Sequence, residues 1–126
     1  MVGCKWLYKI KGAGDKAKPR FKDRLVARGF TQVQGVDFNE IFSPVVRHTS
    51  IRILLAITAQ LNLHLEQINV TIAFLHGDLE ERILMEQPVG FKDKGKVEKV
   101  CLLKKSLYGL KQSPRQWYQK FDSVIC

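Results

Sequence analysis

The sequence is poor in cysteine, in acidic residues and in long apolar runs. Its three cysteines, Cys4, Cys101 and Cys126, are odd in number and form no close pair, which argues against a disulfide framework and a zinc knuckle. We therefore expect free thiols in a reducing compartment. No apolar run approaches the roughly 18 residues of a membrane span, and the N-terminus lacks a signal-peptide pattern. These absences predict an intracellular protein, cytoplasmic or nuclear, with no membrane partner.

Signatures of several enzyme classes are also missing. The sequence has no Ser-His-Asp or Cys-His arrangement typical of a hydrolase, and its three histidines lie too far apart to predict a ligand cluster. The run Gly12-Ala13-Gly14 follows a predicted strand but leads to another strand, whereas a phosphate-binding loop opens a helix. With 126 residues and 45% hydrophobic content, the chain is predicted to form one domain around a single core.

Acidic residues are outnumbered by basic ones. Lys and Arg total 21 against 12 Asp and Glu, which gives a formal net charge of +9. Such a chain attracts polyanions, and binding of this kind weakens with salt, so nucleic acid is the obvious candidate partner. A solvated basic surface that binds nothing specific is the alternative that charge alone leaves open.

Period-two patterns predict strands over residues 5–11 and 21–27, joined by a turn at residues 12–15, with Pro19 keeping the connection extended. Residues 29–44 show no clear period and are predicted to be mostly loop. Four side chains are expected to anchor this loop in the core: Phe30, Phe38, Ile41 and Phe42. A helical spacing of apolar residues then predicts a helix to about Asn62, with Thr49 or Ser50 as its N-cap.

The period returns to two from Leu63, which predicts a central strand over residues 63–70 with Asn69 on one face and Glu66 on the other. Short strands are expected at residues 83–86 and 100–104, separated by a charged loop at residues 92–99.

A last helix is predicted from Ser113, with Ser113 as N-cap, Pro114 at the first helical position and Gln116 completing a capping box. Four residues are expected to share one face of this helix: Trp117, Phe121, Val124 and Ile125. Core packing is the favoured role of Trp117.

Several motifs in fixed order resemble a known family. The most informative is Asn69-Val70-Thr71-Ile72-Ala73-Phe74-Leu75-His76-Gly77, and the others occupy residues 5–11, 24–32, 42–46, 85–88 and 107–117. Together they resemble the reverse transcriptase domain of copia-type (Pseudoviridae) retrotransposons. Ordered motifs along almost the whole chain are far more specific than one short match.

The resemblance implies a polymerase palm whose first metal-binding acid is replaced. Where the family carries Asp-Val-Lys-Thr-Ala-Phe-Leu-His-Gly, this chain has Asn69 at the position of the Asp. The parent enzymes use Mg²⁺ held by carboxylates, and an amide has no negative charge to contribute, so we expect Asn69 to abolish catalysis and no functional metal to bind. Two nearby acids are poorly placed as substitutes. Glu66 lies on the opposite strand face, and Asp78 lies in a turn with Glu80 and Glu81 that is expected to face solvent.

The same resemblance implies further site residues. Lys22 and Arg24 would face the incoming nucleotide triphosphate, Phe74 would lie under its sugar, and Tyr108 and Gly109 would contact template and nucleotide, with Gly109 permitting a close backbone approach. Residues in these positions have plainer roles as well: Lys22 and Arg24 as solvated strand residues, and Phe74 as a core side chain.

The sequence therefore predicts an α+β fold, a partial right-hand polymerase with antiparallel strands packed on helices, spanning residues 1–126. Residues 1–48 would form a fingers-like hairpin and loop, and residues 49–126 would form the adjoining fingers and palm. The helix that ends near Asn62 would lie behind the palm sheet, and the sequence would end before the family's aromatic-x-Asp-Asp box. Its parents bind RNA or DNA template-primer and dNTP and synthesise DNA on RNA. The alternatives are a non-catalytic module that binds nucleic acid weakly and nonspecifically, with Lys111 as a further groove cation, and a pseudogene-like product without independent function.

Overall fold

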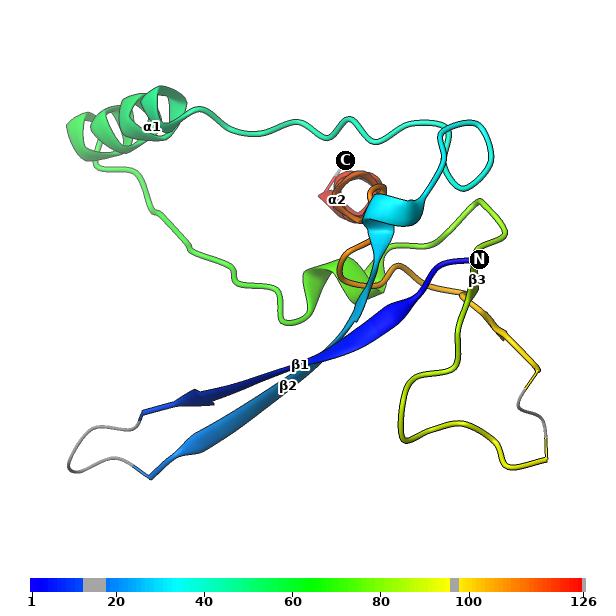
Figure 1. Ribbon diagram of the computed structural model, residues 1–126. Coiled ribbons are helices and arrows are strands. Elements are labelled where there is room, and N and C mark those ends of the chain that lie inside the picture. The colour runs from blue at the N-terminus through cyan, green and yellow to red at the C-terminus, as the bar shows by residue number, and fades with distance from the viewer. Residues whose placement is uncertain (13–17, 96–97, 126) are drawn as a thin grey trace.

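The computed structural model describes residues 1–12, 18–95 and 98–125 (Figure 1). Its elements in chain order are β1 (Cys4–Lys11), β2 (Arg20–Ala27), the 3-10 helix η1 (Gly29–Thr31), α1 (His48–Gln60), the 3-10 helix η2 (Ala73–His76), β3 (Leu84–Met85), β4 (Cys101–Leu102) and α2 (Ser113–Ile125). Strands pair as two antiparallel, two-stranded sheets, β1 with β2 and β3 with β4. The expected α+β class is confirmed.

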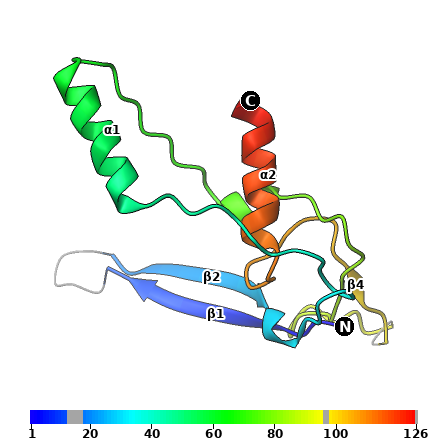
Figure 2. The same cartoon turned by 90° about the horizontal axis from the view of Figure 1, so that it is seen from above.

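A long hairpin is the most regular part of the fold. β1 and β2 pair over their full length, from Cys4 opposite Ala27 to Lys11 opposite Arg20. This confirms the two predicted strands, whereas residues 13–15 of the predicted turn lie outside the described residues. The hairpin extends away from the rest of the chain, with only its root beside the other elements (Figures 1 and 2).

The core sits at the root of this hairpin. It consists of Val2, Ala27, Ile83 and Leu110, against which Leu79, Leu103 and Leu107 pack. Backbone hydrogen bonds hold the layers together: the N–H of Val2 donates to the Leu84 carbonyl oxygen at 2.8 Å, and the N–H of Leu103 donates to that of Ile83 at 3.0 Å. The predicted strands at 83–86 and 100–104 are confirmed, although each is shortened to two residues.

α2 is confirmed as a helix, but its predicted N-terminal cap is wrong. The hydroxyl of Ser113 donates to the Leu107 carbonyl oxygen at 2.7 Å, and the N–H of Gln116 donates to the Gln112 carbonyl oxygen at 3.0 Å. Ser113 is thus the first residue of the helix, and Pro114 is the second. The side chain of Ser113 thereby ties the preceding loop to the helix.

α1 forms where apolar spacing predicted it, yet it packs differently from the expectation. Its N-cap is Arg47, with no side-chain hydrogen bond, so neither Thr49 nor Ser50 caps it. None of its residues is buried. The expected packing behind a palm sheet is therefore absent from the described structure, in which α1 stands apart at the end of two connecting segments (Figure 2). Its backbone hydrogen bonds are internal, but a helix of 13 residues without a packing partner is only marginally stable in water.

Residues 63–70, predicted as the central palm strand, form no strand in the described structure, and all are exposed. A strand requires a neighbour to pair its backbone groups. The predicted alternation survives locally: Nε2 of His64 lies 3.1 Å from Oε1 of Glu66, and Ile68 and Val70 line one hollow beside α2. The period-two pattern thus predicted which side chains share a side, but not whether a partner strand is present.

The loop after β2 contributes one of its four expected anchors. Phe38 is buried at 5% exposure, but Phe30, Ile41 and Phe42 are exposed at 78%, 47% and 69%, so those three predictions are wrong. Polar residues occupy the interior beneath this loop instead: Gln32, Gln112 and Gln116 are all buried. The amides of Gln32 and Gln112 provide partners for backbone groups, which apolar side chains cannot do.

Candidate functional site

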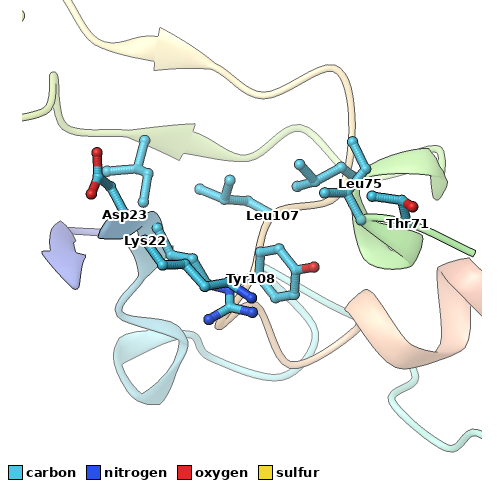
Figure 3. Close-up of a pocket in the computed structure, with 9 residues that line it drawn as sticks. Lys22, Asp23, Thr71, Leu75, Leu107 and Tyr108 are labelled. Carbon is cyan, nitrogen blue, oxygen red and sulfur yellow. The ribbon is translucent and has the colours of Figure 1, made fainter. Parts of the chain in front are cut away.

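A hollow of about 320 Å³ opens where the edge of β2 meets the loop before α2 and the segment entering η2 (Figure 3). Three separate parts of the chain line it: β2, residues 71–75 and residues 107–108. The lining residues are Lys22, Asp23, Arg24, Leu25, Thr71, Ile72, Leu75, Leu107 and Tyr108. Two of the predicted cations and the predicted tyrosine therefore share one site.

Ring contacts connect the predicted residues of this hollow. The guanidinium carbon of Arg24 lies 5.7 Å from the centre of the Tyr108 ring, within reach of a cation–π interaction. The Phe74 ring packs edge-on with the Tyr108 ring, and the two ring centres lie 5.5 Å apart. Arg24, Tyr108 and Phe74 thus form one continuous cluster, and Phe74 is half-buried rather than fully in the core.

Gly109 fixes the loop on which Tyr108 stands. Its φ of +93° lies in the left-handed region, and an added Cβ would overlap the Ala27 carbonyl oxygen and press against Val26. Beside it, the N–H of Ala27 donates to the Tyr108 carbonyl oxygen at 2.7 Å. The predicted need for a small residue at 109 is met, and the close backbone approach in this structure is to β2.

Positive charge concentrates beside the hollow. The neighbouring guanidinium of Arg24 is the main cause that lowers the pKa of the Lys22 amino group below its ordinary 10.5, followed by desolvation and by Lys11, Arg20 and Lys9. These groups repel one another because they share a small region. An anion placed between them would relieve this repulsion.

A buried amide network, which the sequence analysis missed, holds the Tyr108 loop in place. Nε2 of Gln32 donates to Oε1 of Gln112 at 3.1 Å, and Nε2 of Gln112 donates to the Asp37 carbonyl oxygen at 3.0 Å. The N–H of Lys111 donates to Oε1 of Gln32 at 2.9 Å. Gln112 is fully buried, so each amide depends on its partner. Position within a recognised motif was the only signal in the sequence for these glutamines.

Lys111 is engaged in the same network. Its Nζ donates to the Gln32 carbonyl oxygen at 3.1 Å and lies 5.1 Å from the centre of the Phe38 ring. Lys111 thus ties the loop after β2 to the start of α2, and its role as a groove cation stays a prediction.

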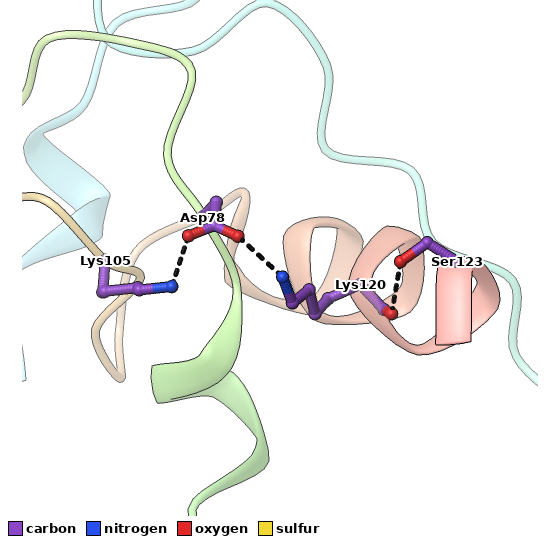
Figure 4. A network of polar contacts seen from close by, with 4 residues as sticks. All are labelled: Asp78, Lys105, Lys120 and Ser123. Carbon is purple, nitrogen blue, oxygen red and sulfur yellow. Dashed lines mark hydrogen bonds and ion pairs between the residues drawn. The ribbon is translucent and has the colours of Figure 1, made fainter. Parts of the chain in front are cut away.

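In the acidic turn after η2, Asp78 and Glu80 are exposed as predicted, whereas Glu81 is half-buried. The Asp78 carboxylate accepts hydrogen bonds from Lys105 and from Lys120, the latter at 3.2 Å, and thereby joins η2, the segment after β4 and α2 (Figure 4). Hydrogen bonds from Lys105 and then Lys120 lower the pKa of Asp78 below its ordinary value. Oε2 of Glu81 is buried and has no hydrogen-bond partner among the described residues. The lysine contacts of Asp78 therefore connect an exposed turn to the rest of the fold.

The sequence analysis also missed the residues next to Phe74 in the motif at residues 69–77. Ile72 adopts φ of +53°, an unusual conformation for a β-branched residue, and its position at the start of η2 turns the chain into the hollow. Thr71 and Leu75 line the hollow beside it. Their position next to Phe74 in the recognised motif was the available signal.

Asn69 is not among the residues that line the hollow, and it is exposed. Its donor chemistry does not fit Mg²⁺, which carboxylates usually hold in proteins, because the amide oxygen of Asn is neutral. Across residues 1–12, 18–95 and 98–125, no group of three or more His, Cys, Asp or Glu side chains is placed to hold a metal ion. The two acids considered as substitutes are engaged elsewhere, Glu66 with His64 and Asp78 with its lysines.

A second hollow, of about 360 Å³, is almost wholly apolar and lies along α2. Trp117, Phe121, Val124 and Ile125 line it together, which confirms their predicted common face. Trp117 is half-buried, with its ring centre 5.7 Å from that of Phe121, so its predicted packing role is only partly met. Within the described part of the chain, neither helix has the length and apolar character that a membrane crossing requires.

These observations agree with the comparison with known families. The family described as reverse transcriptase (RNA-dependent DNA polymerase) matches residues 1–126, and the chain belongs to this family. Members of the family bind a template-primer and use divalent metal ions.

Relatives among curated proteins confirm the copia-type resemblance. The retrovirus-related Pol polyprotein from transposon TNT 1-94 of Nicotiana tabacum is 62% identical over 97% of this chain and 9% of its own length. That from transposon RE2 of Arabidopsis thaliana is 46% identical over 99% of this chain and 9% of its own length. The Ty1-BL Gag-Pol polyprotein of Saccharomyces cerevisiae is 34% identical over 82% of this chain and 6% of its own length. The chain thus spans less than a tenth of these relatives, and no solved structure matches it.

Proposed function

We propose that this chain is the fingers and first part of the palm of a right-hand polymerase whose parent carries out RNA-directed DNA synthesis. Residues 1–48 correspond to the fingers-like hairpin and loop, and residues 49–126 to the adjoining fingers and palm. The observation that carries the proposal is the convergence of Lys22, Arg24 and Tyr108 on one hollow from elements far apart in sequence. Cations supply the charge that a triphosphate needs, and the Tyr108 ring offers a flat surface to a base or sugar.

Phe74 is proposed as the residue under the nucleotide sugar, where its bulk excludes a 2′ hydroxyl by steric contact. Its edge-on packing against Tyr108 supports this assignment, because it sets the Phe74 ring beside the hollow. Gly109 contributes through the backbone, since its tight packing on Ala27 fixes the loop that carries Tyr108.

Nucleotide binding tests this site. Titration of a deoxynucleoside triphosphate, followed by nuclear magnetic resonance shifts of the backbone amides, should perturb residues 22–24 and 107–109. The double substitution Lys22→Gln and Arg24→Gln should abolish these shifts, whereas Lys92→Gln with Lys94→Gln, which removes the same charge far from the hollow, should leave them. Equal effects of the two variants would contradict the assignment.

Catalytic inactivity of this polypeptide is the second part of the proposal. Polymerase chemistry needs carboxylates to hold two divalent ions, and Asn69 replaces the first of them. The 126 residues also contain no Asp-Asp pair, so Asn69→Asp alone is not expected to restore primer extension.

The remaining candidate is a non-catalytic module that binds nucleic acid through its basic surface. The net charge of +9 and the repulsion among cations beside the hollow favour it. It is compatible with the inactivity proposed above, and it predicts duplex binding that weakens steeply with salt. Salt-independent binding would exclude it.

A further inference from the structure

The apolar hollow along α2, termed here the α2 hollow, is bordered by the segment that follows α1. Its lining consists of Ile68, Val70, His76, Trp117, Lys120, Phe121, Val124 and Ile125. Ile68 and Val70 belong to the connection between α1 and η2, and the last five residues belong to α2. The chain that leaves α1 therefore runs directly into the wall of the α2 hollow.

α1 carries an apolar stripe that no neighbour buries. Ile51, Leu54 and Leu55 recur at helical spacing, and each side chain is between 44% and 63% exposed. Arg52, which is the one lysine or arginine of α1, lies outside this stripe. Because a helix of 13 residues is only marginally stable by itself in water, a persistent α1 needs a surface that covers the stripe.

The loop that leads to α1 is fastened to the first turn of α2. Oγ of Ser43 donates to the Pro114 carbonyl oxygen at 3.3 Å, and the guanidinium of Arg115 donates to the Phe42 carbonyl oxygen at 3.3 Å. Residues 44–47 contain no helix or strand, and a link of that length reaches at most about 14 Å. α1 therefore begins within a short distance of α2, and the segment after it returns to α2 as well.

We propose that α1 is a lid that closes on the α2 hollow of its own chain and sets its apolar stripe against Trp117 and Phe121. In the structure this lid stands open at the end of two connecting segments (Figure 2). The hinges are residues 44–47 and 63–67, which are exposed and contain no helix or strand. Closure buries two uncovered apolar surfaces against each other, which is favourable in water. The lid does not rest on the nucleotide-facing role proposed for the first hollow.

Tethering favours α1 of the same chain over α1 of a second copy. Links this short hold a segment near its site at an effective concentration on the order of millimolar, which exceeds the micromolar concentration of a dilute protein solution. A second copy also carries the same net charge of +9, so the two copies repel each other. Closure within one chain adds no such repulsion.

Hydrogen exchange of the α1 backbone amides, followed by nuclear magnetic resonance, tests the lid with Leu54→Ala. Alanine has the highest helix propensity, so this substitution should keep or raise the protection of a helix that stands alone. In a closed lid the same substitution removes a buried side chain. The protection of the α1 amides should then fall by about tenfold or more.

Arg52→Ala is the matched control on α1, because Arg52 lies outside the apolar stripe, and it should leave the protection of the α1 amides unchanged. Phe121→Ala tests the α2 hollow and should lower this protection by about tenfold or more as well. Phe30→Ala, at a side chain that is 78% exposed and does not line the α2 hollow, should not lower it. Exchange of the β1–β2 amides in the same samples shows whether each variant stays folded.

Unchanged or higher protection in Leu54→Ala would overturn the proposal, because α1 would then stand alone. Wild-type α1 amides that exchange as fast as those of an unfolded chain would overturn it as well. Protection that rises with protein concentration would show that a second copy covers the stripe and would also contradict a lid within one chain. Concentration-independent protection that both Leu54→Ala and Phe121→Ala lower is the result expected.

Discussion

Replacing Gly109 by alanine should destabilise the fold more than a change of one methyl group ordinarily does. The new Cβ would overlap the Ala27 carbonyl oxygen, and φ of +93° disfavours any residue with a side chain. The backbone conformation costs about 1–2 kcal/mol, the overlap about 1–3 kcal/mol, and loss of the hydrogen bond between the Ala27 N–H and the Tyr108 carbonyl about 1 kcal/mol. The free energy of unfolding should fall by roughly 3–6 kcal/mol in total.

Gly90→Ala is the matched control for this substitution. Gly90 has a similar φ of +87°, but nothing lies within 4 Å of an added Cβ. Only the backbone cost of about 1–2 kcal/mol applies there. Urea unfolding followed by circular dichroism and tryptophan fluorescence measures both losses. Equal losses for the two variants would refute the argument that close packing of the Tyr108 loop on β2 holds the site together.

Two further substitutions test the contacts around the site. Gln112→Leu leaves the buried amide of Gln32 without its partner and should lower the free energy of unfolding by about 1–3 kcal/mol. Gln119→Leu, on the exposed side of α2, should change this free energy little. Similar losses in the two variants would contradict a buried network. Because folding lowers the pKa of Asp78, the ionised carboxylate stabilises the fold fully above pH 3.8, which is the ordinary pKa of this group. This stabilisation is lost as the pH falls below 3.8 through the lower pKa of the folded state. Asp78→Asn should therefore show a flatter acid-side fall in urea midpoint than the wild type, and parallel curves would count against the lysine contacts.

Local patterns predicted those elements whose hydrogen bonds are local. The hairpin β1–β2 followed from period-two alternation on both sides of a turn, and both α-helices followed from helical spacing. In each case the partner groups lie within the element or in the adjacent strand, so a short window of sequence contains the information.

Features that depend on distant partners were predicted less well. Residues 63–70 alternate as a strand does, but only a neighbouring strand makes them one. Phe30, Ile41 and Phe42 are apolar enough for a core, yet the interior beneath their loop is filled by Gln32 and Gln112, whose pairing spans 80 residues of sequence. No periodicity reports such a pairing.

The candidate site was likewise only partly predictable from the sequence. The family resemblance pointed to Lys22, Arg24, Phe74 and Tyr108. The structure places Lys22, Arg24 and Tyr108 on one hollow and packs Phe74 against Tyr108. The cations of the β1–β2 hairpin gather on one of its two faces. This pattern was present in the sequence, but only the strand register, with Lys9 opposite Lys22 and Lys11 opposite Arg20, reveals it.

Primer extension on an RNA template tests the central claim most directly, namely the proposed catalytic inactivity of this member of the reverse transcriptase family. The purified 126-residue polypeptide would be assayed with Mg²⁺ beside an active reverse transcriptase, together with Asn69→Asp. Neither form should extend the primer, because the wild type lacks the first carboxylate for the metal ions and Asn69→Asp restores that one alone. Extension by the wild type above the no-enzyme level would contradict the account at Asn69.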